Sequence, residues 1–201
     1  MPDTFAGIYG EIRSEYYQNI YTAMLDYLTA PEGTRITKGK RAYMQAINGA
    51  FWDAFEEGYQ DGGEELPLDP ASFEWVKGKI AREFEYAAGL FDRLRDEVKP
   101  DGTQETLSAE LNARAEGYAK TLDGVYAQGK ARGAKDTPLT LVGADGHEHC
   151  DTCRRLKGTW HKASWWVAED LVPYPGNENY ICKGWQCQHY LQDRNGKMFA
   201  A

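Results

Sequence analysis

The first 146 residues of this 201-residue chain contain neither cysteine nor histidine. All four cysteines and all four histidines of the protein lie in the remaining part. Thiolates and imidazoles are the ligands that a tetrahedral Zn²⁺ site requires, and imidazole is also the commonest general base. Their absence excludes a zinc site of this type and a cysteine- or histidine-based active site from the long N-terminal part.

Long apolar runs are also missing. Apolar stretches such as Trp165–Ala168 extend over only a few residues, whereas a membrane-spanning helix needs about 20. The first residues lack the basic and apolar regions of a secretory signal, and no Asn-x-Ser/Thr sequon occurs. We therefore expect no membrane association and a reducing, intracellular compartment, where paired cysteines favour metal binding over disulfides.

Basic residues are scarce before residue 140, where 16 Lys and Arg stand against 24 Asp and Glu. Residues 140–201 hold seven of each sign, so the net charge of −8 belongs to the rest of the chain. An acidic body repels a phosphate backbone, which argues against general nucleic-acid binding through this part. The neutral C-terminal part leaves room for a local contact with DNA.

The N-terminal part shows helical periodicity. Four segments carry apolar residues at every third or fourth position, the pattern of an amphipathic helix. The first three cover residues 5–28, 34–59 and 70–98, and the fourth opens at residue 103, carries apolar residues to Val125 and extends to residue 129. In the third, Asp69 is a good N-cap, and Pro70 suits the first helical position. Gly117, Gly124 and Gly129 in the fourth indicate either close approach of a neighbouring backbone or fraying.

Short turns between long helices predict an up-down bundle. A stretch rich in Gly, Lys, Thr and Pro, residues 129–138, separates these helices from the rest. Residues 139–142 predict a short strand, and residues 143–146 a turn. The sequence thus predicts a mostly α fold, with an N-terminal up-down helical bundle at 1–133 and a small zinc-bound α+β module at 139–201.

The cysteines of the predicted module form two close pairs. Cys150 and Cys153 have two residues between them, which lets both sulfurs reach one ion from a tight turn. Cys182 and Cys187 have four. We therefore expect the four thiolates to form a closed, structural Zn²⁺ site. His189, two residues after the last cysteine, is the alternative metal ligand.

Other uses of these residues are four free buried cysteines, a redox dithiol and a catalytic zinc. A dithiol at Cys150 and Cys153 belongs in a βαβ pattern, which the surrounding sequence lacks. A catalytic zinc needs a base beside an open water position, and Glu148 is the residue close by. The deaminase pattern, His-x-Glu and then Pro-Cys-x-x-Cys, is not met. We expect His149 to be exposed or to hydrogen-bond a ligand, and His161 to be structural.

Aromatic residues are concentrated in the predicted module, which holds four of the six tryptophans. These are Trp160, Trp165, Trp166 and Trp185. We expect them to form its hydrophobic core, with base stacking or partner docking as the alternative. The 13 tyrosines lie mostly in or beside the apolar stripes of the helices, where core packing is expected and a partner-binding face is the alternative.

Three motifs between residues 107 and 191 occur together in one family. An Ala-Arg-x-Glu-like segment spans residues 113–116. After a linker come a Cys-x-x-Cys-x-x-Leu-x-Gly run at 150–158 and a closing element at 182–189. This part of the chain resembles the C-terminal domain of phage head morphogenesis proteins, the Mu F-like and SPP1-type minor head proteins. His189 stands where the family has a final cysteine, and the His-Pro dipeptide common before it is absent.

The resemblance implies a structural virion protein, present in a few copies and associated with the phage portal and/or capsid protein. It implies a role in head assembly or genome delivery and no turnover of a small-molecule substrate, so that no enzyme activity is expected. The expected location is the virion, and the host cytoplasm during assembly.

Two other functions fit the paired cysteines. HNH-type nuclease modules bracket their active site with two such pairs, and between them carry Asp-His-x-x-Pro and a later Asn, here Asn177 or Asn179. The position of the general-base histidine is taken by Leu171, or by Asp170 if shifted by one, and neither replaces an imidazole in activating water. A nuclease-like module is therefore expected to be inactive. The third reading is a cytosolic adaptor whose zinc-stabilised module binds protein.

Overall fold

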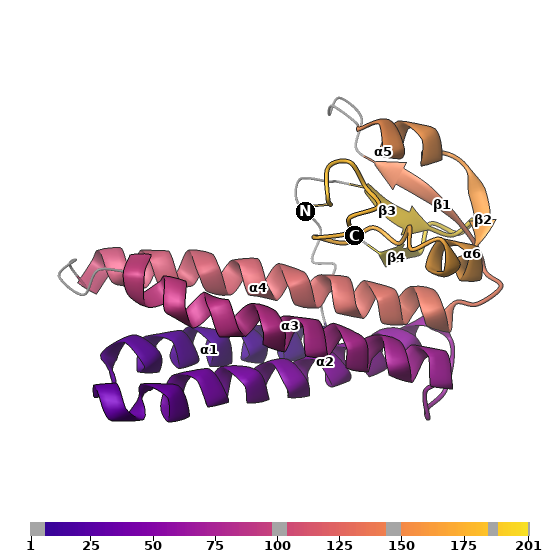
Figure 1. Ribbon diagram of the computed structural model, residues 1–201. Coiled ribbons are helices and arrows are strands. Elements are labelled where there is room, and N and C mark those ends of the chain that lie inside the picture. The colour runs from indigo at the N-terminus through magenta and orange to yellow at the C-terminus, as the bar shows by residue number, and fades with distance from the viewer. Residues whose placement is uncertain (1–6, 98–103, 144–149, 185–188, 201) are drawn as a thin grey trace. The chain divides into compact units, whose positions relative to one another are not determined.

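The computed structural model describes residues 7–97, 104–143, 150–184 and 189–200. This part of the chain is mostly helical with a small C-terminal sheet, which confirms the predicted mostly α fold (Figure 1). None of the helices in it combines the length and the apolar character that a membrane span requires.

The chain divides into two compact units, and neither is a continuous segment. The first, the bundle unit, comprises Met1–Trp52 and Phe73–Ala119. The second, the sheet unit, comprises Asp53–Ser72 and Lys120–Ala201. This division differs from the predicted domains, which separate the helices from the C-terminal module between residues 133 and 139.

Four long helices account for most of the chain. They are α1 (Ile8–Thr29), α2 (Arg41–Gly62), α3 (Pro70–Glu97) and α4 (Gln104–Gly133). Each overlaps a predicted segment. The largest difference precedes α2, where a 3-10 helix at Glu32–Thr34 (η1) and a π-helix at Ile36–Lys40 (η2) come before the regular α-helix. Residues 144–146 of the turn predicted at 143–146 lie outside the described residues.

Aromatic side chains join the helices of the bundle unit. The ring centroids of Tyr16 in α1 and Phe51 in α2 lie 6.0 Å apart. Tyr43 in α2 packs edge-on against Phe91 in α3 at 5.2 Å and against Tyr118 in α4 at 5.4 Å. These contacts tie all four helices together and agree with the predicted helical bundle.

The start of α3 follows its predicted cap. Asp69 Oδ1 accepts hydrogen bonds from the backbone N–H groups of Ala71 at 2.9 Å and Ser72 at 3.0 Å. Burial acts to raise the pKa of the Asp69 carboxyl, but the hydrogen bonds from Ser72 and Ala71 outweigh it and lower that pKa. The N-cap prediction is confirmed, because the ionised carboxylate satisfies amide groups that the helix leaves without a partner.

Within the sheet unit, α2 and α4 approach one another at glycines. A Cβ added to Gly129 would lie 2.3 Å from the carbonyl oxygen of Phe55, and one added to Gly133 would lie 2.1 Å from that of Tyr59. Conversely, a Cβ on Gly58 would lie 2.3 Å from the carbonyl oxygen of Tyr126. The two backbones therefore touch, and close approach is the correct alternative for Gly129.

The other two glycines of α4, Gly117 and Gly124, do not contact the backbone of α2 as Gly129 and Gly133 do. A Cβ on Gly124 would lie 2.9 Å from the Cβ of Tyr174, so that this glycine also faces a close neighbour. A Cβ on Gly117 would meet no atom within 4 Å. Neither close approach nor the end of the helix accounts for Gly117.

The sheet has four antiparallel strands in the order β2-β1-β3-β4. They are β1 (Pro138–Gly143), β2 (Trp160–Lys162), β3 (His189–Gln192) and β4 (Met198–Ala200). The central strand β1 contains the strand predicted at residues 139–142, which is confirmed. Leu139, Leu141 and Leu191 are buried on one face, and Leu141 pairs with Leu191 across β1 and β3.

The core of the sheet unit includes one face of α4. Ala127, Ala131 and Ala134 of that helix belong to the same buried cluster as the sheet leucines and Trp166. The helices α5 (Asp151–Leu156) and α6 (Ala163–Ala168) have six residues each and bury little by themselves. The end of α4 belongs to the sheet unit because its alanines complete this core.

The tryptophans have different roles. Trp166 is fully buried, and its indole N–H donates to the carbonyl oxygen of Leu139 at 3.2 Å. Trp165 packs edge-on against it, with ring centroids 5.1 Å apart. Trp160 is 46% exposed and is not part of the core. Trp185 lies outside the described residues.

Candidate metal centre

Three cysteine sulfurs form a compact group. The Sγ atoms of Cys150, Cys153 and Cys182 all lie within 4.8 Å of one another. Sγ of Cys150 is 3.4 Å from Sγ of Cys153 and 3.6 Å from Sγ of Cys182, and none of the three cysteines forms a disulfide. Sulfurs bound to one tetrahedral Zn²⁺ at about 2.3 Å are separated by about 3.8 Å. The three thiols therefore fit a single metal ion.

The first two ligands come from the beginning of α5. Cys150 occupies the N-cap position in an extended conformation, and its carbonyl oxygen accepts a hydrogen bond from the N–H of Arg154 at 2.9 Å. Cys153 follows within the first turn of α5 and is buried. One helical turn therefore directs both sulfurs to the same point, as the two-residue spacing predicts.

The residues after the first cysteine pair fix α5 to the sheet. Leu156 is buried in the core of the sheet unit. Gly158 adopts a φ of +78°, a conformation that favours glycine, and its N–H donates to the carbonyl oxygen of Leu141 at 3.0 Å. The Leu and Gly of the Cys-x-x-Cys-x-x-Leu-x-Gly run thus have structural roles beside the thiols.

The third ligand lies in a loop that a buried asparagine organises. Asn177 is fully buried, and its side-chain N–H₂ donates to the carbonyl oxygens of Asp170 and Val172, both at 2.9 Å. The hydroxyl of Tyr180, also buried, donates to the carbonyl oxygen of Leu171 at 2.7 Å. These bonds position residues 170–184, called here the Asn177 loop. In the sequence, Asn177 stands out only as a candidate nuclease position.

Two further contacts place Cys182 beside α5. The N–H of Ile181 donates to the hydroxyl oxygen of Thr152 in α5 at 3.4 Å. Gly184 has a φ of +71°, and a Cβ there would lie 2.0 Å from the carbonyl oxygen of Tyr174. The loop therefore requires a glycine directly after Lys183 and holds the neighbouring cysteine close to the first pair.

The surroundings of Cys150 favour its thiolate form. Burial acts to raise the pKa of the Cys150 thiol, but hydrogen bonds from Cys153 and Cys182 outweigh it and lower the pKa to about 7. An unfolded cysteine has a pKa of about 8.5. The ionised thiol therefore stabilises the metal-free fold fully above about pH 8.5, and this contribution is lost as the pH falls through the folded pKa. Thiolate is also the form that binds metal.

The structure brings three of the four predicted ligands together. Cys187 and its neighbours at 185–188 lie outside the described residues. Within the described part, the group contains no histidine and no carboxylate. His189, the alternative ligand, is buried in β3, where its ring lies against Gly143. The fourth ligand stays a prediction, with Cys187 as the first choice.

The other candidate residues lie elsewhere. His161 stacks on Trp165 with ring centroids 3.7 Å apart, which agrees with the expected structural role. Glu148 and His149 lie outside the described residues. Of the nuclease positions, Leu171 is buried, and Asn179 donates from its side-chain amide to the Asp170 carboxylate at 3.0 Å.

Comparison with known proteins gives no relative for this chain. No protein-family model matches it, and neither a curated protein nor a solved structure is similar to it. The cysteine group and the sequence motifs are therefore what bears on its function.

Proposed function

We propose that this chain is a structural phage virion protein, a minor head or head-morphogenesis component whose C-terminal module is held by a structural zinc ion. The main supporting observation is the group of three thiols within 4.8 Å, contributed by α5 and by the Asn177 loop. The motif resemblance supports the virion role, because the two Cys, the Leu and the Gly of the Cys-x-x-Cys-x-x-Leu-x-Gly run contribute to this group or anchor it.

The proposed Zn²⁺ would act as a cross-link and supply no reaction chemistry. Strands of three to six residues and two helices of six residues bury little apolar surface. Small modules of this kind gain folding free energy from metal binding. Cys150 and Cys153 would hold α5, Cys182 would hold the loop, and Cys187 would complete a closed tetrahedral set.

Purified protein is expected to contain about one equivalent of Zn²⁺ per chain, because a closed four-ligand site binds a single ion. Inductively coupled plasma mass spectrometry of protein prepared without added metal measures this. Treatment with a chelator should remove the zinc and the packing signal of the tryptophans together. Folded protein that contains no metal would contradict the site.

No DNA cleavage is expected in the presence of Mg²⁺ or Mn²⁺. Both asparagines that are candidates for the nuclease position hold the Asn177 loop, and Leu171, at the position of the required base, is buried. Incubation of plasmid and linear DNA with the purified protein tests this. Cleavage that is lost on replacing Asp170 or Asn179 would favour the nuclease instead.

The virion role is tested by finding the chain in its assembled context. Mass spectrometry of purified phage heads is expected to detect it, and an affinity-tagged chain is expected to retain co-expressed portal or capsid protein. A chain that is absent from purified heads, and that instead co-purifies with a cytosolic protein, would support the adaptor function. The zinc measurement is independent of both outcomes.

A further inference from the structure

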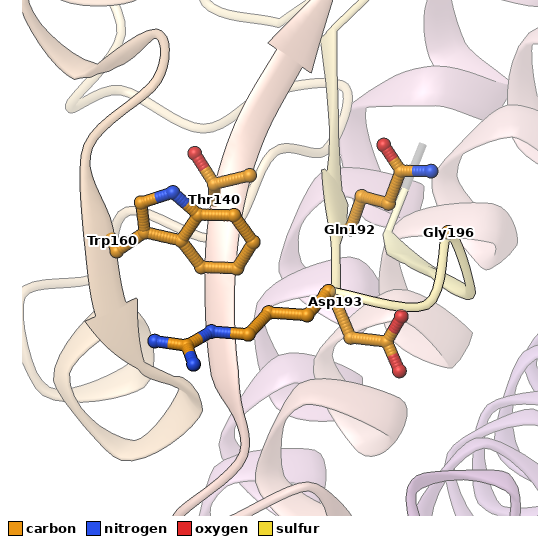
Figure 2. A pocket seen from close by; sticks show the side chains of 6 residues that line it. Thr140, Trp160, Gln192, Asp193 and Gly196 are labelled. Carbon is orange, nitrogen blue, oxygen red and sulfur yellow. The ribbon is translucent and has the colours of Figure 1, made fainter.

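A pocket of about 570 Å³ lies on the sheet face opposite the core (Figure 2). Neighbouring residues along a strand point to opposite faces, so Thr140 faces away from the buried Leu139 and Leu141. The pocket is lined by Thr140, Trp160, Gln192, Asp193, Arg194 and Gly196. The metal centre does not involve any of these residues.

The strand register builds the floor of the pocket. Thr140 in the central strand β1 pairs with Trp160 in β2 on one side and with Gln192 in β3 on the other. Paired residues in an antiparallel sheet lie on the same face, about 4.5–5.5 Å apart between Cβ atoms. An indole, a hydroxyl and an amide therefore form a row across three strands, and Figure 2 shows Thr140 between the other two.

The hydroxyl of Thr140 forms no hydrogen bond within the described part of the chain. Thr140 is 7% exposed, and its Oγ1 is buried without a hydrogen-bond partner among the described residues. A buried polar group without a partner costs folding free energy, so native proteins keep few of them. Thr140 lines the pocket, and a ligand bound there can supply the missing hydrogen-bond partner.

A cation lies beside the indole. The guanidinium carbon of Arg194 is 5.6 Å from the centroid of the Trp160 ring, within cation–π distance. Arg194 forms no ion pair with any carboxylate in the part of the chain that the structure describes. Trp160 is 46% exposed. The pocket thus presents an accessible aromatic surface and a planar set of N–H donors without an anion.

Acceptors are present as well. Oδ1 of Asp193 accepts hydrogen bonds from the backbone N–H groups of Asn195 and Lys197, both at 2.8 Å, which fixes the turn between β3 and β4. Asp193 and Gln192 both line the pocket. The wall can therefore pair with a group that both donates and accepts.

We propose that this pocket binds a nucleotide moiety, with the base on Trp160 and the phosphate at Arg194. Stacking on an aromatic side chain suits every base, and guanidinium binds phosphate through two parallel hydrogen bonds. Asp193 and Gln192 can pair with the amino group and ring nitrogens of a base edge. The carboxylates of an acidic peptide would satisfy Arg194 but offer no planar ring to Trp160.

The same moiety occurs in a free nucleotide and in single-stranded nucleic acid. The electrically neutral segment 140–201 permits either, in contrast to the acidic remainder of the chain. The pocket shares no residue with the metal centre, and the proposal does not depend on the virion role.

The test uses the full chain labelled with ¹⁵N and follows the indole N–H signal of Trp160, assigned with Trp160→Phe. Adenosine monophosphate and a short deoxyadenosine oligonucleotide are titrated at low salt. We expect this signal to shift and the affinity to fall as salt rises. Arg194→Gln should weaken binding about tenfold or more. Arg82→Gln, which removes the same charge from an exposed site on α3, should leave it unchanged.

A shift with the oligonucleotide alone identifies single-stranded nucleic acid as the source, and an equal shift with the mononucleotide identifies a free nucleotide.

Thr140→Val should weaken binding severalfold and yet raise the melting temperature, because it removes a buried hydroxyl without a partner. The proposal is overturned if neither probe shifts Trp160 or if Arg82→Gln weakens binding as much as Arg194→Gln. A shift caused by hexaglutamate, and by neither nucleotide probe, would overturn it in favour of an acidic protein partner.

Discussion

Cys153→Ser is expected to abolish zinc binding and to unfold the C-terminal sheet, while most of the helical signal is kept. Cys153 is buried, and its sulfur lies 3.4 Å from that of Cys150. A structural Zn²⁺ contributes apparent binding free energies of about 10–16 kcal/mol in small zinc modules. Serine cannot replace a thiolate ligand, so most of this stabilisation is lost.

Two circular dichroism measurements distinguish local from global unfolding. The near-ultraviolet signal should collapse, since it reports the fixed packing of Trp165 against Trp166 and His161. The far-ultraviolet signal at 222 nm should fall only modestly, because the bundle unit keeps its own aromatic core. The end of α4 should lose some helicity, as Ala127 and Ala131 pack in the affected core.

Matched variants identify the fourth ligand and separate the loss of a ligand from general destabilisation. Cys187→Ser should reproduce the loss of zinc, whereas His189→Gln should keep the metal, measured by the thiolate-to-cobalt absorption of Co²⁺-substituted protein. The reverse pattern would make His189 the ligand. Equal loss of both dichroism signals in Cys153→Ser would argue against a helical bundle that folds without the metal.

Periodicity was sufficient to predict the long helices, because burial of one stripe decides where they form. It could not predict the π-helix η2. A Cβ on Gly39 would lie 2.3 Å from the Cβ of Tyr27, so this segment packs directly on the backbone of α1. A contact of this kind depends on the tertiary arrangement and leaves no regular pattern in the sequence.

The metal centre was only partly predictable for a similar reason. Spacing alone indicates that Cys150 and Cys153 share an ion, since one turn of chain joins them. The contribution of Cys182 depends on hydrogen bonds made by Asn177, and a polar residue in a turn can equally well be catalytic. Likewise, the alanines of α4 follow a helical stripe, and this pattern does not reveal whether they pack in the bundle unit or in the sheet unit.

Gly129→Ala is expected to destabilise the protein by about 2 kcal/mol or more, since overpacking a tight contact typically costs 1–3 kcal/mol. The new Cβ would lie 2.3 Å from the Phe55 carbonyl oxygen and 3.1 Å from the Tyr59 backbone nitrogen. Backbone atoms cannot move aside as a flexible side chain can, so α2 and α4 must separate. For a chain of this length, the melting temperature should fall by about 4–8 °C.

Gly117→Ala, in the same helix, is the matched control. A Cβ there meets no atom within 4 Å, and alanine favours a helix over glycine by about 1 kcal/mol. This variant should therefore keep or raise the melting temperature. Gly58→Ala, on the α2 side of the contact, should be as damaging as Gly129→Ala, while Gly49→Ala in α2 should be harmless. Equal stability of Gly129→Ala and Gly117→Ala would show that α2 and α4 are not in backbone contact. The alanines of α4 could then not occupy their place in the core of the sheet unit.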